Sequence, residues 1–199
     1  MIYMMIKTKF WGEADIDESK MLTMANGLIG FEGFTKFVMI PHEKDANFGW
    51  LQSAENQHLC FLITTPTSFM FDYSIDISDE TVNCLGITAA EDVAIYCLVT
   101  VPEDPLQISA NLSGPLIFNV TNCTGEQVVV MDERYSVKHY IIDELKANAP
   151  RVIDNLTSAF TGQAVSEAPP AIDESIFSAE NFAAELEESL KVCNSYMNQ

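Results

Sequence analysis

Short runs of apolar residues, each ended by a turn residue, dominate roughly the first 145 positions of the chain. Three of them end at a proline: 37–40 before Pro41, 59–65 before Pro66, and 93–101 before Pro102. Their length and their content of β-branched and aromatic residues predict strands. The runs are continuous instead of alternating, which indicates strands buried on both faces, as in a small closed or semi-closed antiparallel β-barrel.

Two local patterns add detail to this mainly β fold. The apolar runs 116–120 and 127–131 flank an Asn- and Gly-bearing loop at 121–125, which predicts a hairpin. The stretch from Ser78 to Gly86 begins with a capping residue followed by two acids and ends at a glycine. That is the pattern of a short helix, so we expect one helical turn between the strands.

The composition changes near Pro150, where the strand-like runs stop. We expect a barrel domain over 1–148, a linker rich in small and turn residues over 149–175, and an acidic amphipathic C-terminal helix over 176–199. The predicted helix carries an apolar stripe with three- and four-residue spacing that includes Phe182, Leu186 and Leu190. This stripe must dock on the barrel, on a partner or on another copy of the chain. Self-association through the helix is therefore one alternative.

The charge narrows the class of partner. The formal net charge is −19, which repels phosphate backbones and anionic lipids and attracts basic proteins. We therefore expect no direct binding to nucleic acid or membrane, although acidity that only maintains solubility is the simpler alternative. No run approaches the roughly 20 apolar residues of a membrane span. The chain start lacks the basic region of a secretory signal, so a cytoplasmic protein with reduced cysteines is expected.

A search for catalytic chemistry finds no recognisable set. The histidines His42, His58 and His139 share no ligand-like spacing, and no nucleophile or phosphate-loop motif occurs, so we expect no catalytic residue, metal or cofactor. One alternative stays open, namely a small-ligand-binding barrel or an enzyme that uses a buried thiol and imidazole such as Cys60 and His139. The adjacent acids Glu103 and Asp104 could act as acid and base, but their flanking prolines favour a rigid exposed loop.

Taken in order along the chain, several phrases resemble the FliW family of flagellar assembly factors. They cover about 145 residues and comprise Phe10-Trp-Gly-Glu13, Asn26-Gly-Leu-Ile-Gly-Phe-Glu-Gly-Phe34, Trp50-Leu-Gln-Ser53, Leu59-Cys-Phe-Leu-Ile-Thr-Thr-Pro66, Phe71-Asp-Tyr73, Val99-Thr-Val-Pro-Glu-Asp104, Asn111-Leu-Ser-Gly-Pro-Leu-Ile-Phe-Asn119, Gly125-Glu-Gln-Val-Val-Val130 and Asp132-Glu-Arg-Tyr-Ser-Val-Lys-His139. Thr65, Lys138 and the pair at 113–114 depart conservatively from the pattern. The tail beyond about Pro150 is not covered by it.

The resemblance implies a small β-barrel-like protein without catalysis that has two protein partners. One is flagellin, whose terminal helices the family holds before export. The other is CsrA, a translational repressor of flagellin mRNA that is bound and antagonised when flagellin is absent. An acidic protein would complement a basic RNA-binding repressor. Aromatic anchors could shield an amphipathic flagellin segment.

Candidate partner-binding residues come from the loop-like and strand-end segments of these phrases. They are Phe31, Glu32, Phe34, Trp50, Gln52, Phe69, Asp72, Tyr73, Glu103, Asp104, Asn111 and Asn119, with Phe182, Leu186 and Leu190 as tail contacts. For each aromatic residue, burial in the core is the competing interpretation, and the sequence alone does not decide between the two.

Overall fold

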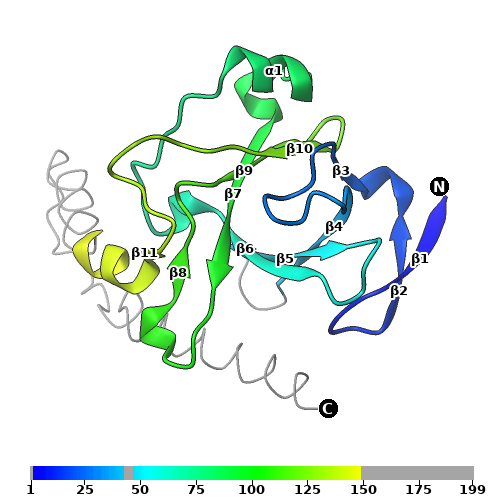
Figure 1. Ribbon diagram of the computed structural model, residues 1–199, viewed down its shortest axis with the longest axis horizontal. Helices are drawn as coiled ribbons and strands as arrows, with labels where there is room; N and C mark the ends of the chain where they lie inside the picture. Colours follow the sequence, from blue (N-terminus) through cyan, green and yellow to red (C-terminus); the bar gives the residue numbers. More distant parts are fainter. Residues whose placement is uncertain (1, 43–46, 149–199) are drawn as a thin grey trace, which may run out of the picture. The chain divides into compact units, whose positions relative to one another are not determined.

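The computed structural model describes residues 2–42 and 47–148, and these ranges divide into two compact units. The first unit comprises 1–100 and 109–139, and the second takes in 101–108 and the chain from Tyr140 onward. Figure 1 shows the course of the chain through both units. The predicted linker at 149–175 and the predicted helix at 176–199 lie outside the described residues.

The first unit is built around a closed barrel of seven strands (Figure 1). The strands are β3 (Leu22–Met24), β4 (Lys36–Pro41), β5 (Phe48–Ser53), β6 (Cys60–Thr64), β7 (Val93–Thr100), β9 (Leu116–Asn119) and β10 (Thr124–Gln127). They follow the order β7-β6-β5-β4-β3-β10-β9, and a ladder between β9 and β7 closes the ring. The predicted barrel is therefore confirmed. The pairs are antiparallel except for β10 with β3, which run parallel.

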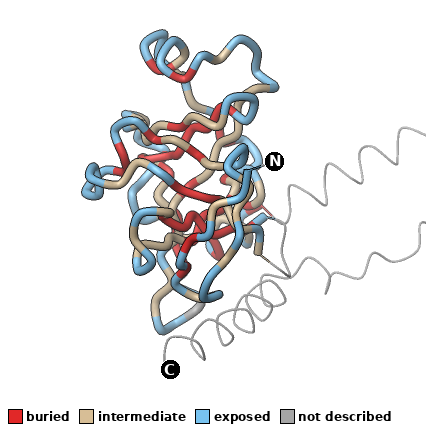
Figure 2. Tube along the Cα trace, turned by 90° about the vertical axis from the view of Figure 1, so that its right-hand side faces the viewer, coloured by how far each residue is buried: buried red, intermediate tan, exposed pale blue. Residues whose placement is uncertain are grey.

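Both faces of several strands are covered, as the continuous apolar runs predicted. All six residues of β5 and all four of β9 are buried. Figure 2 shows buried residues along the inner segments of the tube and exposed residues at many of its outer bends. The barrel interior is filled by an apolar cluster drawn from most of the strands: Leu22, Met24, Leu28, Phe37, Leu51, Ile63, Leu116 and Phe118. Leu28 belongs to the loop between β3 and β4, not to a strand, so this loop helps to close the core.

Shorter elements complete the first unit. β1 (Tyr3–Lys7) and β2 (Glu13–Asp17) form a separate antiparallel two-stranded sheet, and β8 (Ser109–Ala110) pairs with the outer end of β7. The 3₁₀ turns η1 (Glu18–Lys20), η2 (Pro66–Ser68) and η3 (Ala90–Asp92) lie in the connections. The apolar chain start therefore opens the first strand, as expected.

The predicted short helix is present as α1 (Asp79–Leu85). The Ser78 hydroxyl accepts a hydrogen bond from the Thr81 N–H at 3.2 Å, and Gly86 ends the helix with a left-handed φ of 63°. The last helical carbonyl, that of Leu85, accepts hydrogen bonds from side chains that follow β9, those of Asn122 and Thr124. Local capping thus starts and stops the helix, while the hairpin fixes where it lies (Figure 1).

The predicted hairpin is present, but its second strand lies at 124–127 instead of the predicted 127–131, so its loop is shorter than expected. The strand β10 begins at Thr124, so Gly125 lies inside the strand and not in the turn. A Cβ at this position would overlap the Phe118 ring of the facing strand, which explains why a glycine occupies it. The turn is made instead by the preceding residues, with Cys123 at a left-handed φ of 57°.

The described part of the second unit contains the turn η4 (Pro105–Gln107) and a helix over 141–148. The short strand β11 (His139–Tyr140) directly precedes this helix, and the division between the units falls between its two residues. The Ile141 N–H donates to the carbonyl of Ile108 at 3.1 Å, and both side chains are fully buried. No helix was predicted at 141–148, because the segment has too few apolar residues to show a helical period.

Candidate protein-interaction surface

Exposed apolar side chains are the surface feature that most directly suggests contact with another protein. Those in the first unit are Ile2, Tyr3, Met5, Trp11, Ile29, Phe31, Phe71, Val120, Val129, Met131 and Val137. Single exposed apolar residues are normal on protein surfaces, whereas those held rigidly in a group are typical of interaction sites. The loop between β3 and β4 holds such a group.

The backbone of this loop is folded into consecutive tight turns. The Gly27 N–H donates to the Met24 carbonyl at 2.9 Å, and the Phe31 N–H donates to the Leu28 carbonyl at 2.7 Å. Gly27 has a left-handed φ of 66°, and a Cβ there would lie 2.8 Å from the Glu32 Cα. Only glycine satisfies both conditions. The turns direct Leu28 into the barrel and leave Ile29 and Phe31 at the surface.

Phe31 is both exposed and anchored. Its side chain is 40% exposed, and its ring packs edge-to-face on Phe61 of β6 with centroids 5.2 Å apart. Phe34, later in the same loop, packs against the barrel core and is half-buried. An aromatic ring held on one side and open on the other loses little conformational entropy on binding, which suits it to be a protein-binding anchor.

Polar contacts brace the loop from two directions. The Gln127 side chain of β10 accepts a hydrogen bond from the Ile29 N–H at 2.9 Å and donates to the Gly114 carbonyl at 3.0 Å. The Glu32 carboxylate accepts from the Gly30 N–H at 2.8 Å, and the backbone hydrogen bonds lower its pKa. Glu32 therefore stays ionised and places a negative charge beside the exposed Phe31.

A second aromatic group lies where the β1–β2 turn meets β5. The rings of Phe10, Trp11 and Trp50 contact one another with centroid separations of 5.0, 5.6 and 5.9 Å. Trp50 is buried, whereas Trp11 is 41% exposed. The turn is fixed because the Gln52 side chain accepts a hydrogen bond from the Lys9 N–H at 2.9 Å. Trp50 and Gln52 thus position Trp11 without reaching the surface themselves.

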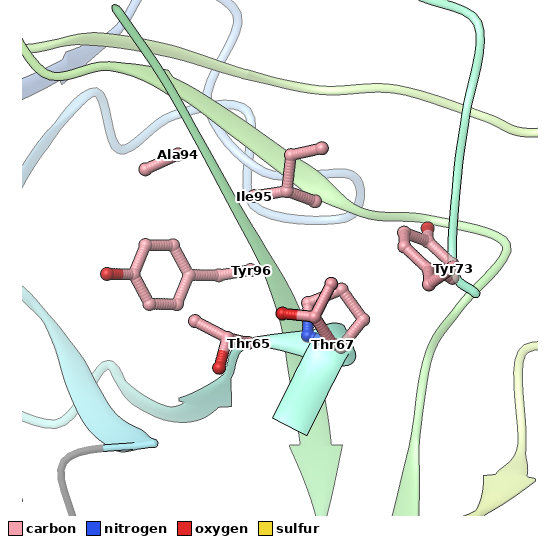
Figure 3. Close-up of a pocket in the computed structure, with 7 residues that line it drawn as sticks. Thr65, Thr67, Tyr73, Ala94, Ile95 and Tyr96 are labelled. Carbon is pink, nitrogen blue, oxygen red and sulfur yellow. The ribbon is translucent and has the colours of Figure 1, made fainter. Parts of the chain in front are cut away.

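A cavity of about 260 Å³ opens beside η2. Figure 3 shows its walls: Ala94, Ile95 and Tyr96 come from β7, and Thr65, Thr67 and Tyr73 come from the chain around and after η2. The Tyr73 hydroxyl donates to the Leu112 carbonyl at 2.9 Å, and burial, the largest cause, raises the pKa of this phenol. The seven described residues that line the cavity include no carboxylate, imidazole or thiol.

Cys97 and the possible metal ligands of the described residues likewise offer no reactive site. Burial raises the pKa of the Cys97 thiol to about 12, so this group stays protonated and unreactive near neutral pH. Among residues 2–42 and 47–148, no three His, Cys, Asp or Glu side chains gather as a metal ion would require. In the same ranges, no helix is both long and apolar enough to cross a bilayer.

The structure separates the predicted binding residues into two groups. Five are buried and support the fold in this conformation: Trp50, Gln52, Phe69, Tyr73 and Asn119. Gln52 donates to four backbone carbonyls, at 53, 56, 57 and 59. Asn119 donates to the carbonyls of Leu85 and Gly86, at the end of α1. Any effect of these five on binding would come through the shape of the surface.

The remaining predicted residues are accessible or half-buried. Phe31, Glu32 and Phe34 come together in the β3–β4 loop, whereas Asp72 is exposed in the loop after η2. Glu103 and Asp104 are exposed before η4 in the second unit, as the loop interpretation expected. Asn111 is half-buried, and its Oδ1 accepts no hydrogen bond from the described residues. The partner-binding role of all twelve stays a prediction, and the tail residues Phe182, Leu186 and Leu190 lie outside the described range.

Two exposed apolar residues were not predicted from the sequence, although the structure places them near predicted ones. Ile29 is 58% exposed and precedes Phe31 in the β3–β4 loop, and Trp11 is 41% exposed in the β1–β2 turn, where it contacts Trp50. A signal for Ile29 was present, because a large apolar residue next to the turn glycine Gly30 has few ways to be buried. No such local signal exists for Trp11, whose exposure depends on the packing of Trp50.

Comparison with known proteins identifies the family. The family model for FliW protein matches residues 5–141. The chain belongs to the FliW family of flagellar assembly factors. Flagellar assembly factor FliW from Caldicellulosiruptor saccharolyticus is 38% identical over 146 residues, which cover 73% of this chain and 95% of that protein. The FliW protein of Leptospira biflexa is 36% identical over 142 residues, with 71% and 93% covered.

A solved FliW structure agrees with this assignment. The crystal structure of the flagellar assembly factor FliW superposes with a TM-score of 0.66 at 33% sequence identity, and it covers 69% of this chain and 96% of that one. The FliW resemblance read from the sequence is therefore confirmed. The match to the family model ends at residue 141, so it does not extend to the tail.

Proposed function

We propose that this flagellar assembly factor binds flagellin in the cytoplasm before export and, when free of flagellin, binds CsrA and relieves its repression of flagellin mRNA. In this proposal flagellin and CsrA compete for the factor, which links flagellin synthesis to flagellin export. The protein would work by binding alone, without catalysis or a cofactor. Membership of the FliW family supports the proposal as a whole.

The observation that carries the flagellin half is the rigid aromatic β3–β4 loop. Phe31 and Ile29 are exposed on a backbone braced by tight turns and by Gln127, so they are presented in a fixed arrangement. Apolar anchors of this kind suit the apolar face of an amphipathic helix that has no partner before assembly. The CsrA half rests on charge, because a basic RNA-binding protein is attracted to a chain with a net charge of −19.

The proposed function predicts two separable complexes. The full chain is mixed with purified flagellin, with CsrA, and with both, and the complexes are resolved by size-exclusion chromatography with light scattering. We expect a complex with each partner alone and displacement of CsrA by flagellin. A chain that binds neither partner would overturn the proposal. A ternary complex would overturn the competition but leave both binding activities in place.

For the alternative of a small-ligand-binding barrel or enzyme, a physical candidate site among the described residues is the 260 Å³ cavity beside η2. Its lining offers hydroxyl groups and apolar surface but no carboxylate, imidazole or thiol. Cys60 and His139, proposed from the sequence as a catalytic pair, do not line this cavity. This cavity therefore offers no observation that favours this alternative over protein binding.

A further inference from the structure

The chain segment 127–131 continues the barrel beyond the end of β10. Its inner side is paired: the Val128 N–H donates to the Pro115 carbonyl at 3.0 Å, and the Val130 N–H donates to the Ser113 carbonyl at 2.9 Å. In an extended chain, successive residues direct their N–H and C=O groups to opposite sides. The backbone groups of Val129 and Met131 therefore point away from the barrel, and no hydrogen bond joins their N–H groups to any part of the chain that the structure describes. Although β10 itself ends at Gln127, the two inner hydrogen bonds continue its antiparallel register, so the segment presents an open edge of extended chain.

The side chains of this edge are also uncovered. Val129 is 65% exposed and Met131 is 95% exposed. Proteins ordinarily protect an open edge with a charge, a proline, a bulge or a covering loop. The sequence Gln127-Val-Val-Val-Met131 contains no charged residue and no proline. An edge that is both apolar and unprotected invites another chain to pair with it.

The edge is connected to the exposed β3–β4 loop. Gln127 is the first residue of the edge. Its side-chain Oε1 accepts a hydrogen bond from the Ile29 N–H at 2.9 Å. Ile29 is itself 58% exposed, so apolar surface lies on both sides of this hydrogen bond. A chain added along the edge would therefore meet side chains from the loop as well as those of Val129 and Met131.

We propose that the edge at 127–131 accepts an extended segment of a partner protein as an additional strand, and that this segment alternates basic with apolar residues. The open N–H and C=O groups require an extended partner and not a helix. Alternate apolar residues would pack on Val129 and Met131. Basic residues would complement the net charge of −19 and the exposed carboxylates of Glu32 and Glu133. A second copy of the chain is opposed by the same charge. The proposal does not require flagellin or CsrA to be the partner.

The test uses the full ¹⁵N-labelled chain and the acetylated, amidated peptide Lys-Val-Lys-Val-Lys-Val-Lys. Amide exchange of the free protein should be slow at Val128 and Val130 and fast at Val129 and Met131. Saturating peptide should slow exchange at Val129 and Met131. The same peptide N-methylated at alternate residues keeps its charge but loses the strand donors, and it should bind at least tenfold more weakly. Equal binding of the two peptides would overturn strand addition.

Variants of the protein locate the contact. Val129→Pro removes the outward N–H without touching those of Val128 and Val130, whereas Val129→Thr keeps the N–H and the branched shape. We expect peptide binding to be lost in the first and retained in the second. If Val129→Pro does not fold, the pair of peptides still decides the question. Equal binding of the acidic peptide Glu-Val-Glu-Val-Glu-Val-Glu would overturn the charge preference. A dimer that Val129→Pro abolishes would make a second copy the occupant and overturn the proposed one.

Discussion

Phe31→Ala is expected to weaken flagellin binding more than it weakens folding. The side chain is 40% exposed, and a phenylalanine buries roughly 200 Å² in full. A partner that covers the exposed part therefore removes about 80 Å² from water, which corresponds to about 2 kcal/mol, or about a thirtyfold change in the dissociation constant.

The same substitution also removes the edge-to-face contact with Phe61, whose centroid lies 5.2 Å away. Such a contact contributes about 1 kcal/mol beyond the area that it buries. The loss is small compared with the 5–15 kcal/mol typical of a domain, so the variant should stay folded with a thermal midpoint a few degrees lower.

Isothermal titration with purified flagellin measures the affinity, and calorimetric unfolding measures the midpoint. Phe71→Ala is the matched control, because it removes an aromatic side chain that is 57% exposed but lies outside the β3–β4 loop. The reasoning is refuted if Phe31→Ala binds as tightly as the parent protein. Equal losses for the two variants would mean that the site is not centred on the β3–β4 loop. Phe34→Ala, in which a half-buried ring is removed, should lower the midpoint more than Phe31→Ala does.

Four further outcomes are expected. Gln52→Ala should lower the free energy of unfolding by about 2–4 kcal/mol in chemical denaturation, because it leaves the buried carbonyl of Ser53, the partly buried carbonyl of Leu59 and the Lys9 N–H without their side-chain partner. An unchanged denaturation midpoint would contradict this. Hydrogen bonds from Thr88, and next from Thr121, lower the Asp92 pKa to about 2. The ionised carboxylate therefore stabilises the fold fully above about pH 4, and this stabilisation is lost as the pH falls towards 2. Asp92→Asn should flatten this part of the profile of thermal midpoint against pH, and an identical slope in the variant would exclude the effect. The association rate with CsrA should fall as salt is raised from low to high concentration, because exposed charges are screened beyond about 8 Å at physiological ionic strength; a flat response in stopped-flow measurements would remove electrostatic steering. Truncation after Asn148 should weaken relief of CsrA–RNA binding and leave flagellin binding intact, as gel-shift and titration experiments can show; if stability and both activities are unchanged, the tail is a passive appendage.

Local signals in the sequence were enough to predict the elements. The apolar runs ending at Pro41, Pro66 and Pro102 became β4, β6 and β7, and the stretch between Ser78 and Gly86 became α1. In each case the determining interaction lies within a few residues: a proline has no N–H to donate to a ladder, a serine hydroxyl reaches the first helical N–H groups, and a glycine adopts a left-handed φ at little cost. The ordered phrases also sufficed to name the FliW family.

The closure of the barrel and the composition of its surface were decided by the tertiary structure. The ladder between β7 and β9 and the parallel pairing of β3 with β10 join segments that are far apart in the chain, and no local pattern encodes them. The same holds for exposure. Phe31 and Phe69 are the same residue type in similar loop-like contexts, yet one is 40% exposed and the other 1%. The difference depends on which neighbours the closed barrel brings to each ring, so the sequence could nominate both as binding residues but could not choose between them. The open edge at 127–131 has the same origin, because its run of valines predicts a strand whether or not another strand lies beside it.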